Sequence, residues 1–145
     1  MASGKRCTCG ERPFMATDVP SEAWPRGWQP IPYAQRCRAR RGELQAQLAH
    51  VVETCRLKAD IAFVVVFGSF ARDEIAPWSD IDVLIVRDAP PESHPVDLVA
   101  DLHRDGALAG ELIGIPTSRY PGDLEATPIG RTILTEGRVV YARST

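Results

Sequence analysis

The stretch that decides the fold runs from Ile61 to Val86 and reads IAFVVVFGSFARDEIAPWSDIDVLIV. Two apolar runs rich in β-branched residues, 61–67 and 83–86, flank a polar loop. Apolar runs of this length, bounded by glycine, proline and polar residues, are typical of buried β-strands. The loop is too short for the helical crossover that a parallel pair needs, so we expect the two strands to be antiparallel.

Two carboxylates, Asp80 and Asp82, open the second apolar run. Because side chains alternate along a strand, these two point to one side and Ile81 points to the other. Like charges at this spacing repel each other, and a cation between them removes that cost. Mg²⁺ prefers oxygen ligands and commonly binds through one or two carboxylates together with substrate phosphates. The pair therefore indicates a site for a hard divalent cation.

The first apolar run ends on Gly68-Ser69. A glycine directly after a strand lets the backbone turn and lets a ligand approach closely. The serine hydroxyl and the backbone N–H groups that follow can bind phosphate oxygens, particularly where a helix begins. A phosphate site that faces a dicarboxylate metal site is the arrangement required for phosphoryl or nucleotidyl transfer.

Gly68-Ser69, ten intervening residues and Asp80-x-Asp82, each half attached to its own apolar run, form a specific combination. It resembles the minimal nucleotidyltransferase signature of the DNA polymerase β superfamily, over roughly residues 38–145. The resemblance implies a polymerase β-type fold of class α/β (α+β), in which helices cover a small mixed β-sheet.

A third apolar run, 112–115, follows Glu111 and predicts another strand. In the resembled family a strand at this place usually begins with an acidic residue, commonly Asp, which completes the catalytic carboxylate set. Glu111 matches that position with one methylene more than Asp. The alternative is that Glu111 is a charged strand-end residue in solvent. Pro116 predicts that this strand ends there, at a sheet edge or a turn.

The resemblance assigns roles to the residues of both motifs. The set that is catalytic and holds metal, with two Mg²⁺ ions expected and ATP as substrate, is Asp80, Asp82 and Glu111. The nucleotide-binding set is Gly68, Ser69, Arg72 and Ser79. Alternatives stay open in the loop, where we expect a short helix to open at Ala71-Arg72. Arg72 contacts phosphate or pairs with Asp73 or Glu74, and Trp78 is buried against the sheet or stacks on a base.

The rest of the domain follows from apolar periodicity and from capping residues. Leu44, Leu48 and Val51 recur at helical spacing, and Thr127-Pro128 is an N-cap followed by a first-turn proline. We expect helices near 40–57, 94–105 and 128–135, and a last strand near 138–142. Cys55 lies on the apolar stripe of the first helix and is expected in the core. A basic cluster lies at the start of that helix and consists of Arg38, Arg40 and Arg41. It is either exposed to solvent or contacts phosphate.

Residues 1–37 are predicted to form a Pro/Gly-rich N-terminal arm, separate from a nucleotidyltransferase domain at 38–145. Recurrent prolines and glycines disfavour a continuous helix or strand in this segment. Purely disordered tails contain few large aromatic residues, yet this segment contains Phe14, Trp24 and Trp28. The arm is either draped on the domain or binds a partner. Cys7-Thr8-Cys9 lacks a second close pair, so we favour free thiols over half of a zinc site.

The charge and the apolar content of the chain limit the kinds of partner that we expect. The formal net charge of −2 gives no basic footprint, so no direct nucleic-acid partner is expected. No apolar run approaches the roughly 20 residues that span a membrane, and no secretory signal is visible, so a cytoplasmic location without membrane contact is expected.

The function expected from the motifs is Mg²⁺-dependent transfer of a nucleoside monophosphate, AMP from ATP, onto an acceptor hydroxyl. Small bacterial proteins of this kind resemble the antitoxin of a toxin–antitoxin pair, which transfers AMP onto a tyrosine of a HEPN-type ribonuclease. The expected protein partner is accordingly a HEPN-type protein or a second copy of this chain. The alternative is a non-catalytic nucleotide-binding protein that neutralises its partner by contact alone.

Overall fold

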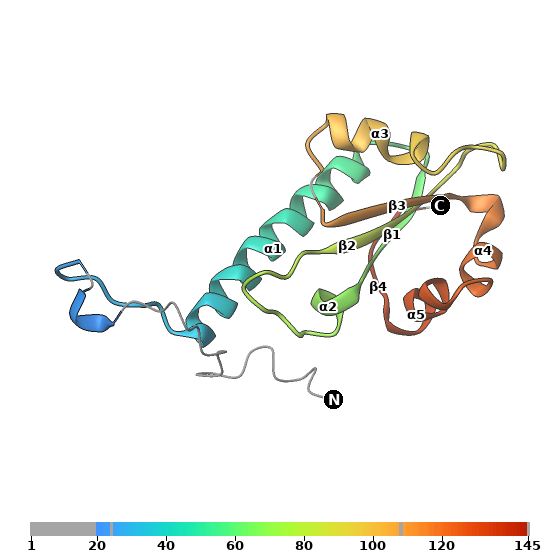
Figure 1. Cartoon of the computed structure of the whole chain (residues 1–145). Helices are drawn as coiled ribbons and strands as arrows, with labels where there is room; N and C mark the ends of the chain where they lie inside the picture. Colours follow the sequence, from blue (N-terminus) through green and yellow to red (C-terminus); the bar gives the residue numbers. More distant parts are fainter. Residues whose placement is uncertain (1–19, 24, 108, 145) are drawn as a thin grey trace.

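The computed structural model describes residues 20–23, 25–107 and 109–144. These residues include a four-stranded sheet of order β3-β2-β1-β4 (Figure 1). The strands are β1 (Ile61–Phe67), β2 (Asp82–Arg87), β3 (Glu111–Pro116) and β4 (Arg138–Ala142). β1 is antiparallel to β2 and to β4, whereas β2 and β3 are parallel, so the predicted mixed sheet and the antiparallel first pair are confirmed. β3 lies at an edge and ends on Pro116, as expected.

Helices lie on both faces of the sheet. α1 (Tyr33–Arg56) and α3 (Asp97–Arg104) cover one face, and α4 (Gly122–Glu125) and α5 (Pro128–Glu136) cover the other (Figure 1). The remaining short elements are α2 (Gly68–Ala71), which directly follows β1, and the 3₁₀ segments η2 (Ser21–Ala23) and η3 (Thr117–Arg119). The fold is therefore α+β, with the sheet between two helical layers.

The alternation of side chains along β1 builds two separate cores. Val64 and Val66 pack with residues of α1 and α3, including Leu44. Val65 and Phe67 point to the other face, where they pack with residues of α4 and α5. Both faces are covered, which explains why the sequence of β1 is a continuous apolar run rather than an alternating one.

Two expectations about local structure need correction, and one helix was not predicted. The first helix begins at Tyr33 rather than near residue 40, because Pro32 precedes its first turn and Cys37 adds a buried position to its apolar face. The short helix after β1 spans Gly68–Ala71 instead of opening at Ala71-Arg72. α4 carries no periodic apolar signal and was not predicted. The boundary between arm and domain at residue 37 stays a prediction, although α1 runs through it.

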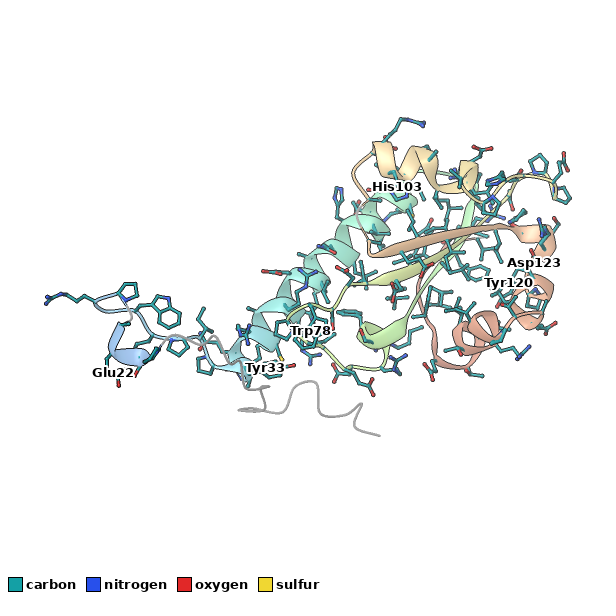
Figure 2. All side chains as sticks on the ribbon, viewed as in Figure 1. Glu22, Tyr33, Trp78, His103, Tyr120 and Asp123 are labelled. Carbon is teal, nitrogen blue, oxygen red and sulfur yellow. The ribbon has the colours of Figure 1, made fainter. Side chains whose placement is uncertain are left out.

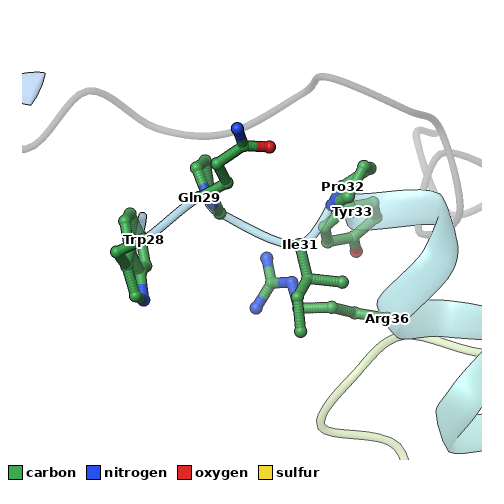
Figure 3. Close-up of a pocket in the computed structure, with 7 residues that line it drawn as sticks. Trp28, Gln29, Ile31, Pro32, Tyr33 and Arg36 are labelled. Carbon is green, nitrogen blue, oxygen red and sulfur yellow. The ribbon is translucent and has the colours of Figure 1, made fainter. Parts of the chain in front are cut away.

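The described part of the arm, residues 20–23 and 25–32, leads away from the sheet at the N-terminal end of α1 (Figure 1). A hollow of about 540 Å³ there is lined by residues 28–33 and Arg36 (Figure 3). Cys7 and Cys9 lie outside the described residues. Cys55 is buried in the core as predicted, and its burial raises the pKa of the thiol to about 11. No helix in the described ranges is long and apolar enough to cross a membrane.

Candidate active site

Two carboxylates stand side by side where β2 and β3 begin. Asp82 and Glu111 are register partners in the parallel pair, and Leu84 pairs with Ile113 two residues further on. Because strand side chains alternate, Asp82 and Glu111 lie on the same face as Leu84 and Ile113, the face covered by α4 and α5. The structure thus brings Glu111 beside Asp82 at the same end of the sheet, which a shared metal site requires.

The electrostatics of Asp82 reflect this crowding. Partial burial raises the pKa of its carboxyl above the usual range, and the negative charges of Glu111 and Asp80 raise it further. Arg72 opposes the shift only in part. Ionised Asp82 is therefore held at a cost, and a cation placed between these carboxylates would lower that cost.

Two glycines lie against the two aspartates. Gly68 has a φ of +80°, and a Cβ at that position would overlap the carboxylate of Asp82. A Cβ on Gly110 would overlap the Cβ of Asp80. The Gly110 N–H also donates to the carbonyl of Ile81 at 2.7 Å, which fixes the start of β3 against the start of β2. Gly110 was not predicted as a site residue; its only sequence signal is its place directly before Glu111.

Asp80 is bound by an arginine that the sequence did not single out. Nη2 of Arg40 lies 2.8 Å from Oδ1 of Asp80, and Nε of Arg40 donates to the carbonyl of Ser79 at 2.7 Å. The cluster of Arg38, Arg40 and Arg41 was the available signal, but spacing alone could not choose among them. Arg41 is directed elsewhere and pairs with Asp73.

The predicted nucleotide-binding residues differ in their freedom to contact a ligand. Ser69 is partly exposed in the first turn of α2. Ser79 is buried, and its hydroxyl accepts a hydrogen bond from the Ala76 N–H at 2.8 Å, which serves the turn before β2. Arg72 pairs with Glu74 and with Glu136, at 3.1 Å in both cases. The ion-pair alternative for Arg72 is therefore present in this structure, with Glu74 rather than Asp73; the phosphate contacts stay predictions.

Trp78 is exposed, contrary to the expectation of burial. Its side chain is 70% exposed, and its ring lies 6.3 Å from that of Tyr33 at the start of α1 (Figure 2). The Tyr33 ring is the aromatic contact that the structure gives Trp78, and most of the Trp78 surface is open to solvent.

The carboxylates fit a hard cation by their chemistry. Asp80, Asp82 and Glu111 supply oxygen donors only, which Mg²⁺ prefers. In the described residues, however, no three Asp, Glu, His or Cys side chains converge closely enough to hold a metal ion as they stand. One oxygen of the Asp80 carboxylate contacts the Arg40 guanidinium instead. Asp82 and the exposed Glu111 are the two carboxylates that the strand register sets side by side, and the metal site stays a prediction.

Comparisons with known proteins match the region of the chain that carries these carboxylates. Residues 49–117 match the family model described as "Nucleotidyltransferase domain", and this range contains every predicted site residue. These matches support the nucleotidyltransferase superfamily.

A curated relative is the "Bifunctional uridylyltransferase/uridylyl-removing enzyme" of Burkholderia orbicola (strain AU 1054), 37% identical over 65 residues. That alignment covers 45% of this chain and 7% of the relative, so the chain spans a small fraction of the relative's length. A crystal structure named "putative nucleotidyltransferase" from Sulfolobus solfataricus has a similar fold, with a TM-score of 0.55. The match covers 82% of this chain and 94% of that one at 18% identity, and it shows the fold alone.

Proposed function

We propose that this protein is a Mg²⁺-dependent nucleotidyltransferase that moves AMP from ATP onto an acceptor hydroxyl. The observation that carries the proposal is the register of β2 and β3, which sets Asp82 beside Glu111. Asp80 precedes Asp82 by two residues, and the lack of a side chain at Gly68 lets the Asp82 carboxylate lie against the backbone there. The nucleotidyltransferase-domain match over these residues supports the same reaction class.

Each residue has a role that its position allows. Asp80, Asp82 and Glu111 would hold the metal ions, which when bound neutralise phosphate charge and lower the pKa of the acceptor hydroxyl. The absence of a side chain at Gly68 lets the strand end and the Asp82 carboxylate lie close together, and Ser69 would donate a hydrogen bond to the triphosphate. The acceptor oxygen bonds to the α-phosphorus, pyrophosphate leaves, and the acceptor proton passes to Glu111 or to solvent.

The acceptor we propose is a tyrosine hydroxyl of a HEPN-type ribonuclease, which the chain would inactivate by AMP transfer. Its support is the resemblance of the Gly-Ser and Asp-x-Asp motifs to those of small antitoxins. UTP is the competing donor, because the named activity of the Burkholderia relative concerns uridylyl groups.

A transfer assay tests the reaction and both donors. The full-length chain is incubated with Mg²⁺, a HEPN-type protein from the same genome, and ATP or UTP labelled at the α-phosphate. We expect label on the partner with ATP, and none with excess chelator or with the Asp80→Asn/Asp82→Asn variant. Labelling of the partner with UTP but not with ATP would identify UTP as the nucleotide donor. If metal and nucleotide bind but no acceptor is labelled, the proposal that the protein is a nucleotidyltransferase would be contradicted.

A non-catalytic binder is the second candidate, favoured by the pairing of Asp80 with Arg40. Such a protein would neutralise its partner without transferring a nucleotide. The Asp82→Asn variant separates the two: a binder keeps its effect on the partner, whereas an enzyme loses it.

A further inference from the structure

The guanidinium of Arg40 is the feature of the site that neither the motifs nor the reaction explains. All three of its nitrogens are engaged: Nε with the Ser79 carbonyl at 2.7 Å, Nη1 with Glu43 at 2.7 Å, and Nη2 with Asp80 at 2.8 Å. The side chain is only 21% exposed, so its position is fixed by contacts from two segments far apart in the sequence. Arg40 comes from α1, whereas Ser79 and Asp80 lead into β2.

The contact places a positive charge where a metal ligand is required. Asp80 lies two residues before Asp82, which pairs in register with Glu111, and a cation beside these carboxylates offsets their mutual repulsion. In this structure the cation at Asp80 is the guanidinium. A divalent ion that took the same carboxylate oxygen would have to replace it.

The geometry allows such an exchange at small cost. The Asp80 side chain is 57% exposed, and ion pairs with this much solvent access are weak. If the Nη2 contact breaks, Nε still donates to Ser79 and Nη1 still pairs with Glu43. The guanidinium can therefore stay in place while Asp80 turns toward Asp82 and Glu111.

We propose that Arg40 is an internal counter-ion that binds Asp80 in the metal-free protein and competes with the divalent cation for it. This inference rests on the proposed metal site. It makes Arg40 a positioning residue that sets the metal affinity: the carboxylate cluster is stabilised without metal, and the metal binds more weakly than three free carboxylates would bind it.

Calorimetric titration of the full chain with Mn²⁺ or Mg²⁺ tests the proposal. Arg40→Ala should bind the metal roughly three- to tenfold more tightly than the wild type, because it removes both a competitor and a nearby positive charge. Arg41→Ala is the matched control: it removes the same charge from the next position of α1, but Arg41 pairs with Asp73 and does not contact Asp80. Its metal affinity should equal that of the wild type.

Melting in excess chelator gives a second readout that needs no metal and no activity. Arg40→Ala should lower the melting temperature, and the same substitution made in an Asp80→Asn background should lower it less, because the ion pair is already gone. Arg40→Met, which keeps the length of the side chain, replaces Arg40→Ala if that variant does not fold. Arg40→Lys keeps the positive charge but lacks the planar guanidinium, so its metal affinity should lie between those of the wild type and Arg40→Ala.

The outcomes are distinct. Unchanged or weaker metal binding by Arg40→Ala overturns the proposal, since Arg40 would then be inert or a support for the metal ligands. An equal gain in Arg41→Ala overturns it as well, because the effect would be one of general charge. If neither wild type nor Arg40→Ala binds metal, the proposed metal site fails and the counter-ion proposal fails with it. If wild type binds metal but transfers no nucleotide, only the proposed function fails.

Discussion

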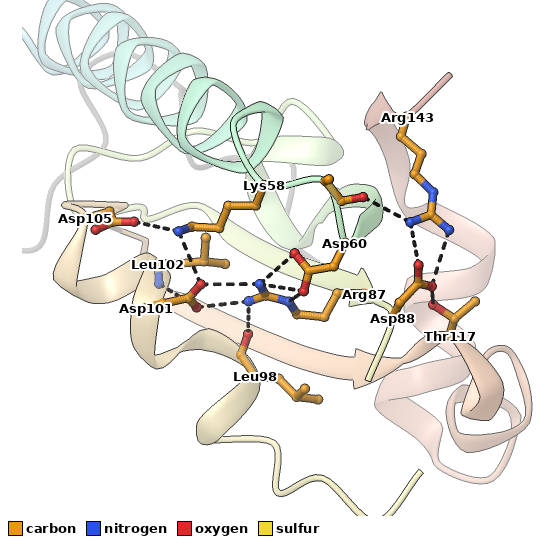
Figure 4. A network of polar contacts seen from close by, with 11 residues as sticks. Lys58, Asp60, Arg87, Asp88, Leu98, Asp101, Leu102, Asp105, Thr117 and Arg143 are labelled. Atoms are coloured by element: carbon orange, nitrogen blue, oxygen red, sulfur yellow. Dashed lines mark hydrogen bonds and ion pairs between the residues drawn. The ribbon is translucent and has the colours of Figure 1, made fainter. Parts of the chain in front are cut away.

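The two ends of strand β2 handle negative charge in opposite ways. At its C-terminal end Arg87, which is 7% exposed, donates to both carboxylate oxygens of Asp60 and to both of Asp101 (Figure 4). It also donates to the carbonyl of Leu98 at 2.8 Å. At its N-terminal end Asp82 lies beside Glu111, and its pKa is raised by burial and by its acidic neighbours.

The cations around the Arg87 end extend this pairing to further carboxylates. Lys58 lies 2.8 Å from Asp105 and 3.3 Å from Asp101. Arg143 lies 2.6 Å from Asp88, which also accepts a hydrogen bond from the Thr117 hydroxyl (Figure 4). Each acidic residue drawn in this network has a basic partner. The difference between the ends indicates that the Arg87 end stabilises the fold, whereas at the other end only Asp80, of the three acidic residues, has a basic partner among the described residues.

The largest effect on activity should come from a substitution at the N-terminal end of β2, where Asp82 lies. Asp82→Asn removes the carboxylate that lies beside Glu111, and we expect turnover to fall by about a thousandfold or more, since metal ligation supplies several kcal/mol of transition-state stabilisation. Stability of the metal-free protein should be unchanged or slightly higher, because a like charge is removed. Labelled-nucleotide transfer and thermal melting measure the two quantities. A marked loss of stability would show that Asp82 is structural.

The next effect belongs to the opposite end. Arg87→Met leaves Asp60 and Asp101 without their guanidinium and should destabilise the fold by about 3 kcal/mol, at the low end for a broken buried pair because both acids reach solvent. Urea unfolding gives the value. Arg143→Ala is the control, with a clearly smaller loss, because its pair with Asp88 is exposed. Equal losses in both variants would remove the distinction between the buried and the exposed part of the network.

A glycine pair sharpens the comparison within the site. Gly110→Ala would force a Cβ into Asp80, and we expect a loss of about 1–3 kcal/mol from overpacking, together with impaired metal binding. Gly42→Ala is the matched substitution in α1, where nothing lies within 4 Å of the added Cβ. It should stabilise the protein by about 0.5–1 kcal/mol through helix propensity. If both substitutions changed the free energy of unfolding in the same direction, the close contact between Gly110 and Asp80 would be contradicted.

The smallest expected effect is a pH dependence of stability at the C-terminal end of β2, where Asp101 pairs with Arg87. Burial alone would raise the pKa of Asp101, but hydrogen bonds and charge from Arg87 and Lys58 outweigh it and hold the pKa below its usual range. A lowered folded-state pKa gives stability that is present above the unfolded value of about 3.9 and is lost as pH falls through the folded value.

Asp101→Asn therefore should cost about 1 kcal/mol at pH 7, and the gap to wild type should shrink below about pH 4. Urea unfolding at a series of pH values measures the gap. A gap that does not change with pH would mean that the ionised form of Asp101 contributes nothing.

Local pattern was enough for the strands. The continuous apolar run of β1 follows from burial on both faces. The antiparallel first pair was predicted from loop length and the edge position of β3 from Pro116, and both are confirmed. The shared side that strand alternation predicts for Asp80 and Asp82 stays a prediction, because β2 begins at Asp82 and Asp80 lies before it. Glu111 needed the family resemblance as well, because no local rule places one strand beside another.

Other features depended on tertiary packing alone. The choice of Arg40 over Arg38 and Arg41 depends on which face of α1 packs toward the loop before β2, about forty residues away in sequence. The exposure of Trp78 depends on how that loop passes α1, and the need for glycine at Gly110 depends on how closely β3 approaches β2. The sequence by itself determined which charges the chain carries and that Asp82 and Glu111 lie where strands begin. Only the packing of α1 and β3 against β2 decided which of those charges are paired, because ion pairing depends on distances between segments that local sequence does not set.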